Sequence, residues 1–346
     1  MSQTDIKSIT LPELKARFTA EGLPAYRAGQ VYRWLSGGVR GFDEMTNLPK
    51  DLRERLAAEN FIAGADIVRK YSSKLDDTVK YLFRLHDGQL VESVLMRYEH
   101  GRTICISSQV GCKMDCAFCA TGQSGYSRDL SPSEMLAQVQ SAQADAGVRI
   151  SNIVLMGMGE PLENYRNVLR FLDLVSSEDG MNVGMRHISL STCGVVDRIY
   201  DLAEKEYQLT LSVSLHAPND EIRSRLMPVN RRWKIGELLD ACRYYQSRTG
   251  RRISFEYAMI GGVNDSRDCA RELARRLKGI MCHVNLIPMN PVEGLPFRKS
   301  PPAVMQRFLG TLEGEGVNAT VRRTLGADID ASCGQLRRRF AEEAVP

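Results

Sequence analysis

Long apolar runs are absent from this 346-residue chain. None approaches the roughly 18–20 residues that a helix needs to cross a bilayer. The first residues, MSQTDIKSITLPELKARF, also lack the apolar stretch of a secretory signal peptide. Fixed-period repeats and low-complexity segments are missing as well. These absences argue against membrane-spanning and repeat proteins, and we expect a cytoplasmic protein with no membrane partner.

Paired cysteines of the kind that staple small secreted domains are not indicated either. The chain has nine cysteines, which is an odd number, and it is long enough to bury a core without disulfides. This pattern favours a reducing compartment, in which cysteines serve metal binding or chemistry.

A large excess of one charge is also missing, because the formal net charge is only +4. The arginines are nevertheless grouped along the chain. The groups are Arg231 and Arg232, Arg251 and Arg252, Arg275 and Arg276, Arg322 and Arg323, and Arg337 to Arg339. Any single pair is also typical of a solvated helix face, but several groups favour a phosphate-rich partner.

Hydrophobic periodicity divides the chain into four parts. Helical patterns at 12–21, 27–35 and 49–59 predict a small helical module over residues 1–62. The segments TVKYLFRL and LVESVLMRY, joined at Asp87-Gly88, predict a β-hairpin within residues 63–97. Six strands alternating with helices follow within residues 98–330, at 103–107, 152–156, 187–191, 209–214, 254–260 and 283–288. We expect an α/β fold with a parallel sheet curled into a partial or complete barrel, and a tail over residues 331–346.

Three cysteines, Cys112, Cys116 and Cys119, follow the first of these strands at C-x3-C-x2-C spacing. A structural zinc site closes its shell with four protein ligands, and ferredoxin-type iron–sulfur clusters are likewise held by four thiolates. A set of three therefore leaves one metal position open for a ligand that is not protein.

Small and polar residues follow the other strands, at the barrel end where parallel α/β enzymes place their chemistry. The segments are GMGEP after the second strand, STCG after the third, SLHAPND after the fourth and PMNP after the sixth. Each alone is typical of a turn, but their gathering on one rim with the three cysteines predicts an active site.

The segments CKMDCAFC and GMGEP resemble the radical S-adenosylmethionine (SAM) superfamily. The resemblance implies a [4Fe–4S] cluster on Cys112, Cys116 and Cys119, with SAM bound to the open iron. Many of these enzymes have a doubled glycine where this chain has GMGEP. For SAM itself, the resemblance implies contacts from Gly159, Glu160, Ser191, Ser214, Leu215, His216 and Asn290.

Longer segments, including SSQVGCKMDCAFCATG, LSVSLHAPNDEIRSRLMPVN and DIDASCGQLR, resemble the RlmN/Cfr family of adenosine methyltransferases, and most closely its RlmN branch. This implies a partial (β/α)6 radical SAM barrel with an N-terminal helical RNA-binding domain. It implies methylation of carbon 2 of adenosine in 23S rRNA and in tRNA near the anticodon, with two SAM molecules per turnover. The implied methyl carrier is Cys333, the resolving cysteine Cys105 and the base Glu92. A monomer and an electron donor such as flavodoxin are also expected.

Several alternatives remain open at this point. Cys105 could be a buried strand cysteine, and Glu92 could be a solvent-facing strand residue. The Cfr-type reaction at carbon 8 shares the cluster and both cysteines. A radical SAM enzyme that activates a glycyl radical would need the cluster but neither Cys105 nor Cys333. An iron–sulfur or zinc protein that only binds RNA would not cleave SAM.

Overall fold

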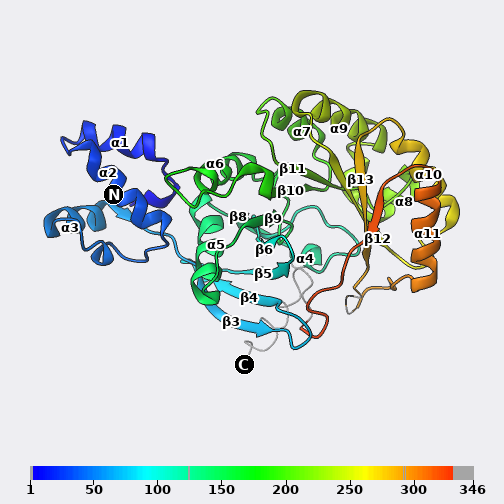
Figure 1. The fold of residues 1–346 in the computed structure, drawn as a ribbon, viewed down its shortest axis with the longest axis horizontal. Helices are drawn as coiled ribbons and strands as arrows, with labels where there is room; N and C mark the ends of the chain where they lie inside the picture. The colour runs from blue at the N-terminus through cyan, green and yellow to red at the C-terminus, as the bar shows by residue number, and fades with distance from the viewer. Residues whose placement is uncertain (1–2, 124, 291, 293, 330–346) are drawn as a thin grey trace.

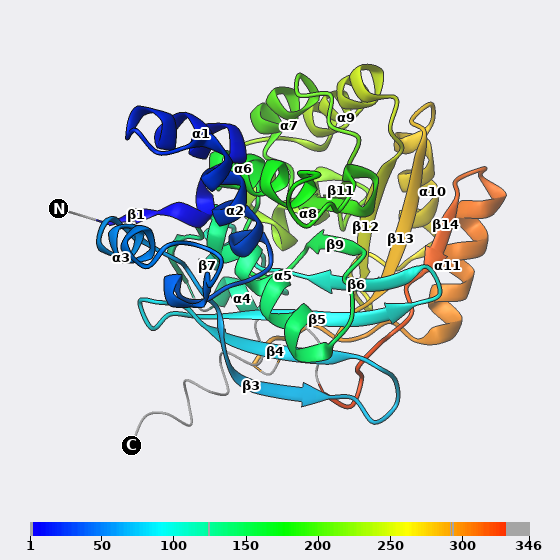
Figure 2. The ribbon, with the colours of Figure 1, turned by 60° about the vertical axis from the view of Figure 1, so that its left-hand side comes forward.

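The computed structural model describes residues 3–123, 125–290, 292 and 294–329 (Figure 1). Its centre is one sheet of ten strands in the order β14-β13-β12-β11-β10-β9-β6-β5-β4-β3. Helices cover its outer face (Figures 1 and 2), and among the described residues the two edge strands, β14 and β3, do not pair with each other. The sheet is therefore a partial barrel, as the resemblance implied.

Seven neighbouring strands of this sheet run parallel. They are β6 (Gly101–Cys105), β9 (Asn152–Leu155), β10 (Ile188–Thr192), β11 (Thr210–Ser214), β12 (Ile253–Met259), β13 (Cys282–Pro288) and β14 (Ala319–Val321). The six predicted strands are thus confirmed to within two residues at each end, and β14 adds a seventh at the edge. The intervening helices are α5 (Pro132–Ala146), α6 (Tyr165–Ser176), α7 (Val196–Ala203), α8 (Asp220–Leu226), α9 (Ile235–Thr249), α10 (Arg267–Leu277) and α11 (Pro302–Gly314).

The predicted hairpin extends this sheet rather than standing apart from it. Strands β4 (Val79–Arg84) and β5 (Leu90–Tyr98) pair antiparallel, and β5 pairs with β6. A further strand, β3 (Asp66–Ser72), pairs with β4 and is the edge strand of the sheet. Gly88 takes the positive φ that its turn requires. Figure 2 shows these strands continuing the barrel wall. Residues of the extension can therefore face the same interior as the barrel strands.

The N-terminal helices form a separate small core. They are α1 (Leu11–Ala20), α2 (Ala25–Ser36) and α3 (Lys50–Glu59), and a two-stranded parallel sheet of β1 (Thr4–Asp5) and β2 (Asn60–Phe61) ties their ends together. Leu14, Phe18 and Val31 are fully buried in this core, and Leu174 of α6 also belongs to it. The helical segment therefore docks on the barrel through α6 (Figures 1 and 2).

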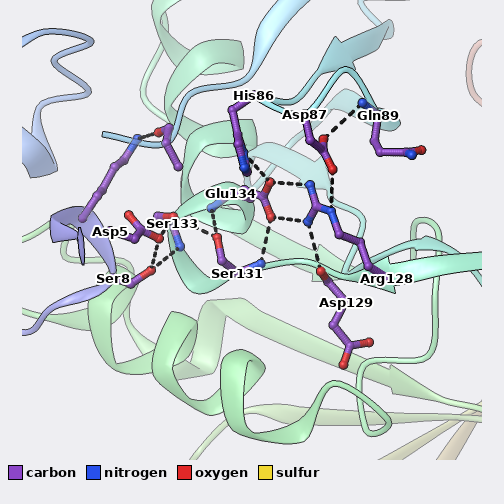
Figure 3. A network of polar contacts seen from close by, with 12 residues as sticks. Asp5, Ser8, His86, Asp87, Gln89, Arg128, Asp129, Ser131, Ser133 and Glu134 are labelled. Atoms are coloured by element: carbon purple, nitrogen blue, oxygen red, sulfur yellow. Dashed lines mark hydrogen bonds and ion pairs between the residues drawn. The ribbon is translucent and has the colours of Figure 1, made fainter. Parts of the chain in front are cut away.

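The start of α5 anchors the N-terminal segment to the barrel (Figure 3). Ser131 and Glu134 form a capping box, and Glu134 also binds Arg128 through two hydrogen bonds of 2.8 Å. Beside them, the Ser133 hydroxyl donates to Asp5, and the Ser133 amide donates to the Ser8 hydroxyl. Because these bonds join residues far apart in the sequence, they fix the position of the helical segment on α5.

Candidate active site at the carboxyl ends of the strands

A cavity of about 540 Å³ lies over the carboxyl ends of the parallel strands. Most of the predicted site residues line it, although they come from six different parts of the chain: Cys105, Cys112, Cys116, Cys119, Gly159, Glu160, Ser191, Ser214, His216 and Asn290. Glu92 and Leu215 do not line it. Cys333 lies outside the described residues.

The cysteine loop is held in shape by its own main chain. It leaves β7 (Gln109–Gly111), continues through the short helix α4 (Ala120–Gln123) and returns along β8 (Tyr126–Asp129). A side chain at Gly111 would overlap the carbonyl oxygen of Gly125, so the two strands approach this closely only with glycine there. The Ala117 amide donates to the Leu226 carbonyl at 2.9 Å, which fastens the loop to the end of α8.

The three thiols suit an iron–sulfur cluster. Burial raises the pKa of Cys112 to about 12 and also raises that of Cys116, so these two thiols are protonated at neutral pH when no metal is bound. A metal that binds them must displace those protons, and soft thiolate ligands favour iron–sulfur chemistry. Among the described residues, no group of three His, Cys, Asp or Glu side chains is arranged to hold a single metal ion. A [4Fe–4S] cluster does not require such an arrangement, because each thiolate binds a different iron.

The GMGEP segment needs both of its glycines. A Cβ at Gly157 would lie 2.6 Å from the Ile106 carbonyl oxygen, and one at Gly159 would lie 2.6 Å from the Cβ of Gln109. Gly159 also has a φ of 101°. Met158, between them, is buried, and its amide donates to the Ser107 hydroxyl. The segment therefore crosses the ends of β6 and β9 at close range without the doubled glycine.

Glu160 is a buried carboxylate at the edge of the cavity. Its Oε2 accepts from the Cys193 amide at 2.7 Å and its Oε1 from the Leu162 amide at 3.0 Å. Burial raises its pKa above the usual value, while these hydrogen bonds oppose that shift. Each oxygen keeps further acceptor capacity. An ammonium group bound in the cavity would stabilise the charged form, so Glu160 suits the amino group of SAM.

His216 is held in an unusual backbone conformation with a φ of 55°. Its Nδ1 accepts from the Ala258 amide at 2.9 Å, which leaves Nε2 to carry the ring proton. Burial, together with the Arg223 charge, lowers the pKa of His216 to about 3. The ring is therefore a neutral hydrogen-bond donor. It packs edge-on against Phe118 of the cysteine loop, with the two ring centroids 5.0 Å apart. The neighbouring Leu215 side chain is fully buried in the core, so a ligand could meet only its main chain.

Arg223 is the residue that sequence reasoning missed. It is fully buried, and its guanidinium donates to the carbonyls of Cys193, Ser214 and Leu215. It also donates to the Asn230 side chain at 3.1 Å. One side chain thus joins the loops that follow β10 and β11. Cys193, in the STCG segment, lines the cavity beside it.

Replacing Arg223 with methionine is expected to destabilise the fold by about 3 kcal/mol or more. Three buried carbonyls would lose their donor, and each unsatisfied group costs about 1–3 kcal/mol before the loops relax. Chemical denaturation measures the loss. Arg225→Met is the control on the same helix, because Arg225 is exposed and surface changes cost about 0.5 kcal/mol or less. Equal stability of the two variants would contradict the joining role of Arg223.

Cys105 and Glu92 lie on adjacent strands. Cys105 lines the cavity and packs with Val94 and Met96, which project from the same face of β5 as Glu92. The Glu92 side chain is only 3% exposed, and its Oε2 lies 3.8 Å from Nζ of Lys80. The solvent-facing alternative for Glu92 is therefore wrong. A buried position for Cys105 is correct, but this cysteine also faces the cavity.

Comparison with known proteins supplies the family. The family model described as "Radical SAM superfamily" matches residues 106–275, and that described as "Ribosomal RNA large subunit methyltransferase N-terminal domain" matches residues 4–62. A probable dual-specificity RNA methyltransferase RlmN from Lachnoclostridium phytofermentans is 49% identical over 99% of this chain and 96% of its own. The chain belongs to the RlmN family.

Other RlmN relatives and a solved structure agree with this membership. The probable RlmN of Alkaliphilus oremlandii is 50% identical over 99% of this chain and all of its own. A crystal structure of a radical SAM methyltransferase from Sphaerobacter thermophilus is 47% identical. It superposes with a TM-score of 0.91 over 96% of this chain and 98% of that one. Membership in the RlmN family means that the protein is a radical SAM methyltransferase that uses a [4Fe–4S] cluster and SAM.

Proposed function

We propose that the protein methylates carbon 2 of adenosine in 23S rRNA and in tRNA near the anticodon, with Cys333 as methyl carrier. The observation that carries this proposal is the meeting of Cys105 with the three cluster cysteines in one cavity. Neither a glycyl-radical activase nor a plain RNA-binding protein has a use for that fourth thiol. The RlmN names of the relatives favour carbon 2 over carbon 8.

The cavity residues would hold the two cofactors. Cys112, Cys116 and Cys119 bind the cluster, and Glu160 receives the amino group of SAM. Gly159 offers a main-chain edge, while Ser191, Ser214, His216 and Asn290 offer hydrogen bonds to its polar groups. When bound, the cluster and SAM supply the radical chemistry that an electron-poor ring carbon requires.

The remaining residues handle the methyl group. The Cys333 thiolate attacks the methyl carbon of SAM and forms S-methylcysteine, while S-adenosylhomocysteine leaves with the electrons of the broken carbon–sulfur bond. After this methyl has lost a hydrogen atom and its carbon has joined carbon 2 of the base, Glu92 accepts the proton that leaves carbon 2. The adduct must also lose one electron, which would pass to the cluster when it is bound. Cys105 then attacks the sulfur of Cys333. The carbon–sulfur bond breaks, the disulfide forms, and the electron pair returns to the base, where a proton completes the methyl group.

The proposal extends to partners and setting. The arginine groups and residues 1–62 would bind folded RNA. Residues 63–97 would contribute Glu92, and residues 98–330 would form the catalytic barrel. Residues 331–346 would form the tail that carries the methyl group on Cys333. Flavodoxin is a suitable electron donor, and the protein would act as a monomer in the cytoplasm. Within the described residues, no helix has the length and apolar character to span a membrane.

Nucleoside analysis of RNA tests this function. We expect total 23S rRNA and tRNA from a strain lacking the gene to lose 2-methyladenosine, and a plasmid copy to restore it. Liquid chromatography with mass spectrometry separates the 2-methyl and 8-methyl isomers against standards. Restoration of the 8-methyl isomer would favour the carbon 8 reaction instead. Unchanged 2-methyladenosine in the deletion strain would contradict the proposal.

A further inference from the structure

A second cavity, of about 600 Å³, lies beyond the carboxyl end of β12. Its walls come from the turn at Gly261 and Gly262, the start of α10, residues 298–299 and the first turns of α11. None of the residues assigned to the cluster or to SAM lines it. It is therefore separate from the catalytic cavity.

Positive charge dominates this cavity. Arg267, Arg298, Lys299 and Arg307 line it, and all four are exposed. In the part of the chain that the structure describes, none of them forms an ion pair, whereas Arg243, Arg248 and Arg276 each have an acidic partner. Asp265, the acidic residue in the lining, instead accepts from the Gly262 amide and the Ser300 hydroxyl.

The main chain holds these cations in place. The Gly261 amide donates to the Arg298 carbonyl at 2.8 Å, and Ile260 and Lys299 form an isolated antiparallel bridge. Arg267 occupies the first turn of α10, an 11-residue helix whose N-cap is Ser266. The amides and dipole of that helix end add to the positive potential. The start of α10, residues 298–299 and the start of α11 thus each place positive charge at the same cavity.

Lys299 also lines the catalytic cavity, so the two cavities are neighbours. When an adenosine of an RNA strand occupies the catalytic cavity, the sugar–phosphate backbone on either side of it must pass over the edge of that cavity. Unpaired arginines favour phosphate groups, which accept their paired hydrogen bonds.

We propose that this basic cavity binds backbone phosphates of the substrate RNA, next to the adenosine that enters the catalytic cavity. This assignment rests on the proposed RNA methylation and adds the place where the strand is held. The cavity would contribute to affinity and positioning for both RNA substrates, because phosphates carry no sequence information.

Binding of an unmodified tRNA transcript to the cluster-loaded protein tests this site. The double variant Arg298→Gln/Arg307→Gln should bind the transcript roughly tenfold more weakly in fluorescence anisotropy. The slope of log affinity against log salt should fall by roughly 0.7–0.9 for each phosphate that the variant no longer neutralises. The matched control is Arg243→Gln/Arg248→Gln on α9, where both arginines pair with acidic residues. The control should keep the affinity and slope of the unaltered protein.

The outcomes separate the two proposals. Equal affinity and slope in the cavity variant and the unaltered protein, with tRNA still methylated, would overturn the phosphate site alone. The same loss of affinity in the control and the cavity variant would also overturn it, because it would indicate a general charge effect. Failure of the unaltered protein to bind or methylate tRNA would instead overturn the proposed function. Cluster absorbance and thermal melting establish that both variants are folded.

Discussion

Replacing Cys116 with alanine is expected to abolish the cleavage of SAM. Cys116 lines the catalytic cavity with Cys112 and Cys119, and the remaining two thiolates would be too few to retain a cluster with a single open iron. Anaerobically reconstituted protein should bind about four irons per chain, and the variant should lose most of them. Chromatography of 5′-deoxyadenosine, formed with a chemical reductant, measures the cleavage.

Cys269→Ala provides the control for this loss. Cys269 lies in the first turn of α10, outside the catalytic cavity, and its replacement should leave iron content and SAM cleavage unchanged. Cys112→Ala and Cys119→Ala should behave like Cys116→Ala. If any of the three variants still forms 5′-deoxyadenosine at the original rate, the cluster assignment is wrong.

Replacing Cys105 with alanine is expected to stop the reaction with RNA still attached to the protein. In the proposed mechanism, Cys333 can take up the methyl and join the base without Cys105. Release of the RNA requires a second thiol that forms a disulfide with Cys333, in which the two sulfur atoms lie about 2 Å apart. The adduct should appear as a slower gel band that ribonuclease removes. Cys333→Ala should form no adduct and no product.

The described chain comes close enough for this pairing. Leu325 packs against the cluster of Val94, Met96 and Cys105. Cys333 follows only eight residues later, and an extended chain covers about 3.3 Å per residue. The tail can therefore reach Cys105, whereas the 228 positions between the two cysteines gave no local reason for them to meet.

Cys193→Ser is the control for the trapped adduct. Cys193 also lines the catalytic cavity, so this variant tests whether the loss of any thiol there is enough to trap the RNA adduct. The serine variant should release its product, because it retains Cys105. Normal turnover by Cys105→Ala without an adduct would contradict the resolving role and leave Cys105 as a structural strand residue.

Much of the fold could be predicted because its signals are local. Apolar segments between turn residues predicted the six parallel strands, and Asp87-Gly88 predicted the turn between β4 and β5. Strand β3 was missed because Asp66, Arg69 and Lys70 give it a polar, half-exposed pattern. Strand β14 is only three residues long. The docking of the helical segment depends on contacts such as Ser133 with Asp5, which no local pattern indicates.

Site residues that belong to a sequence motif could be predicted. Charged residues that the fold buries could not, because their sequence surroundings suggest exposure. The cysteine spacing and the rim segments identified most of the residues that bring chemistry to the catalytic cavity. Arg223 escaped notice because a charged residue on a short helix suggests a solvated face. Only the structure shows that carbonyls from two loops surround its guanidinium. Glu92 was ambiguous for the same reason, since a single strand does not reveal which face is covered.

The central claim is that the methyl group passes through a cysteine and loses one hydrogen on the way. SAM carrying a fully deuterated methyl group tests it directly, with the RNA product analysed as a nucleoside by mass spectrometry. Abstraction from the cysteine-bound methyl predicts 2-methyladenosine that keeps two of the three deuterium atoms, with the abstracted one in 5′-deoxyadenosine. A product that keeps all three would mean direct transfer to the base and would contradict the account.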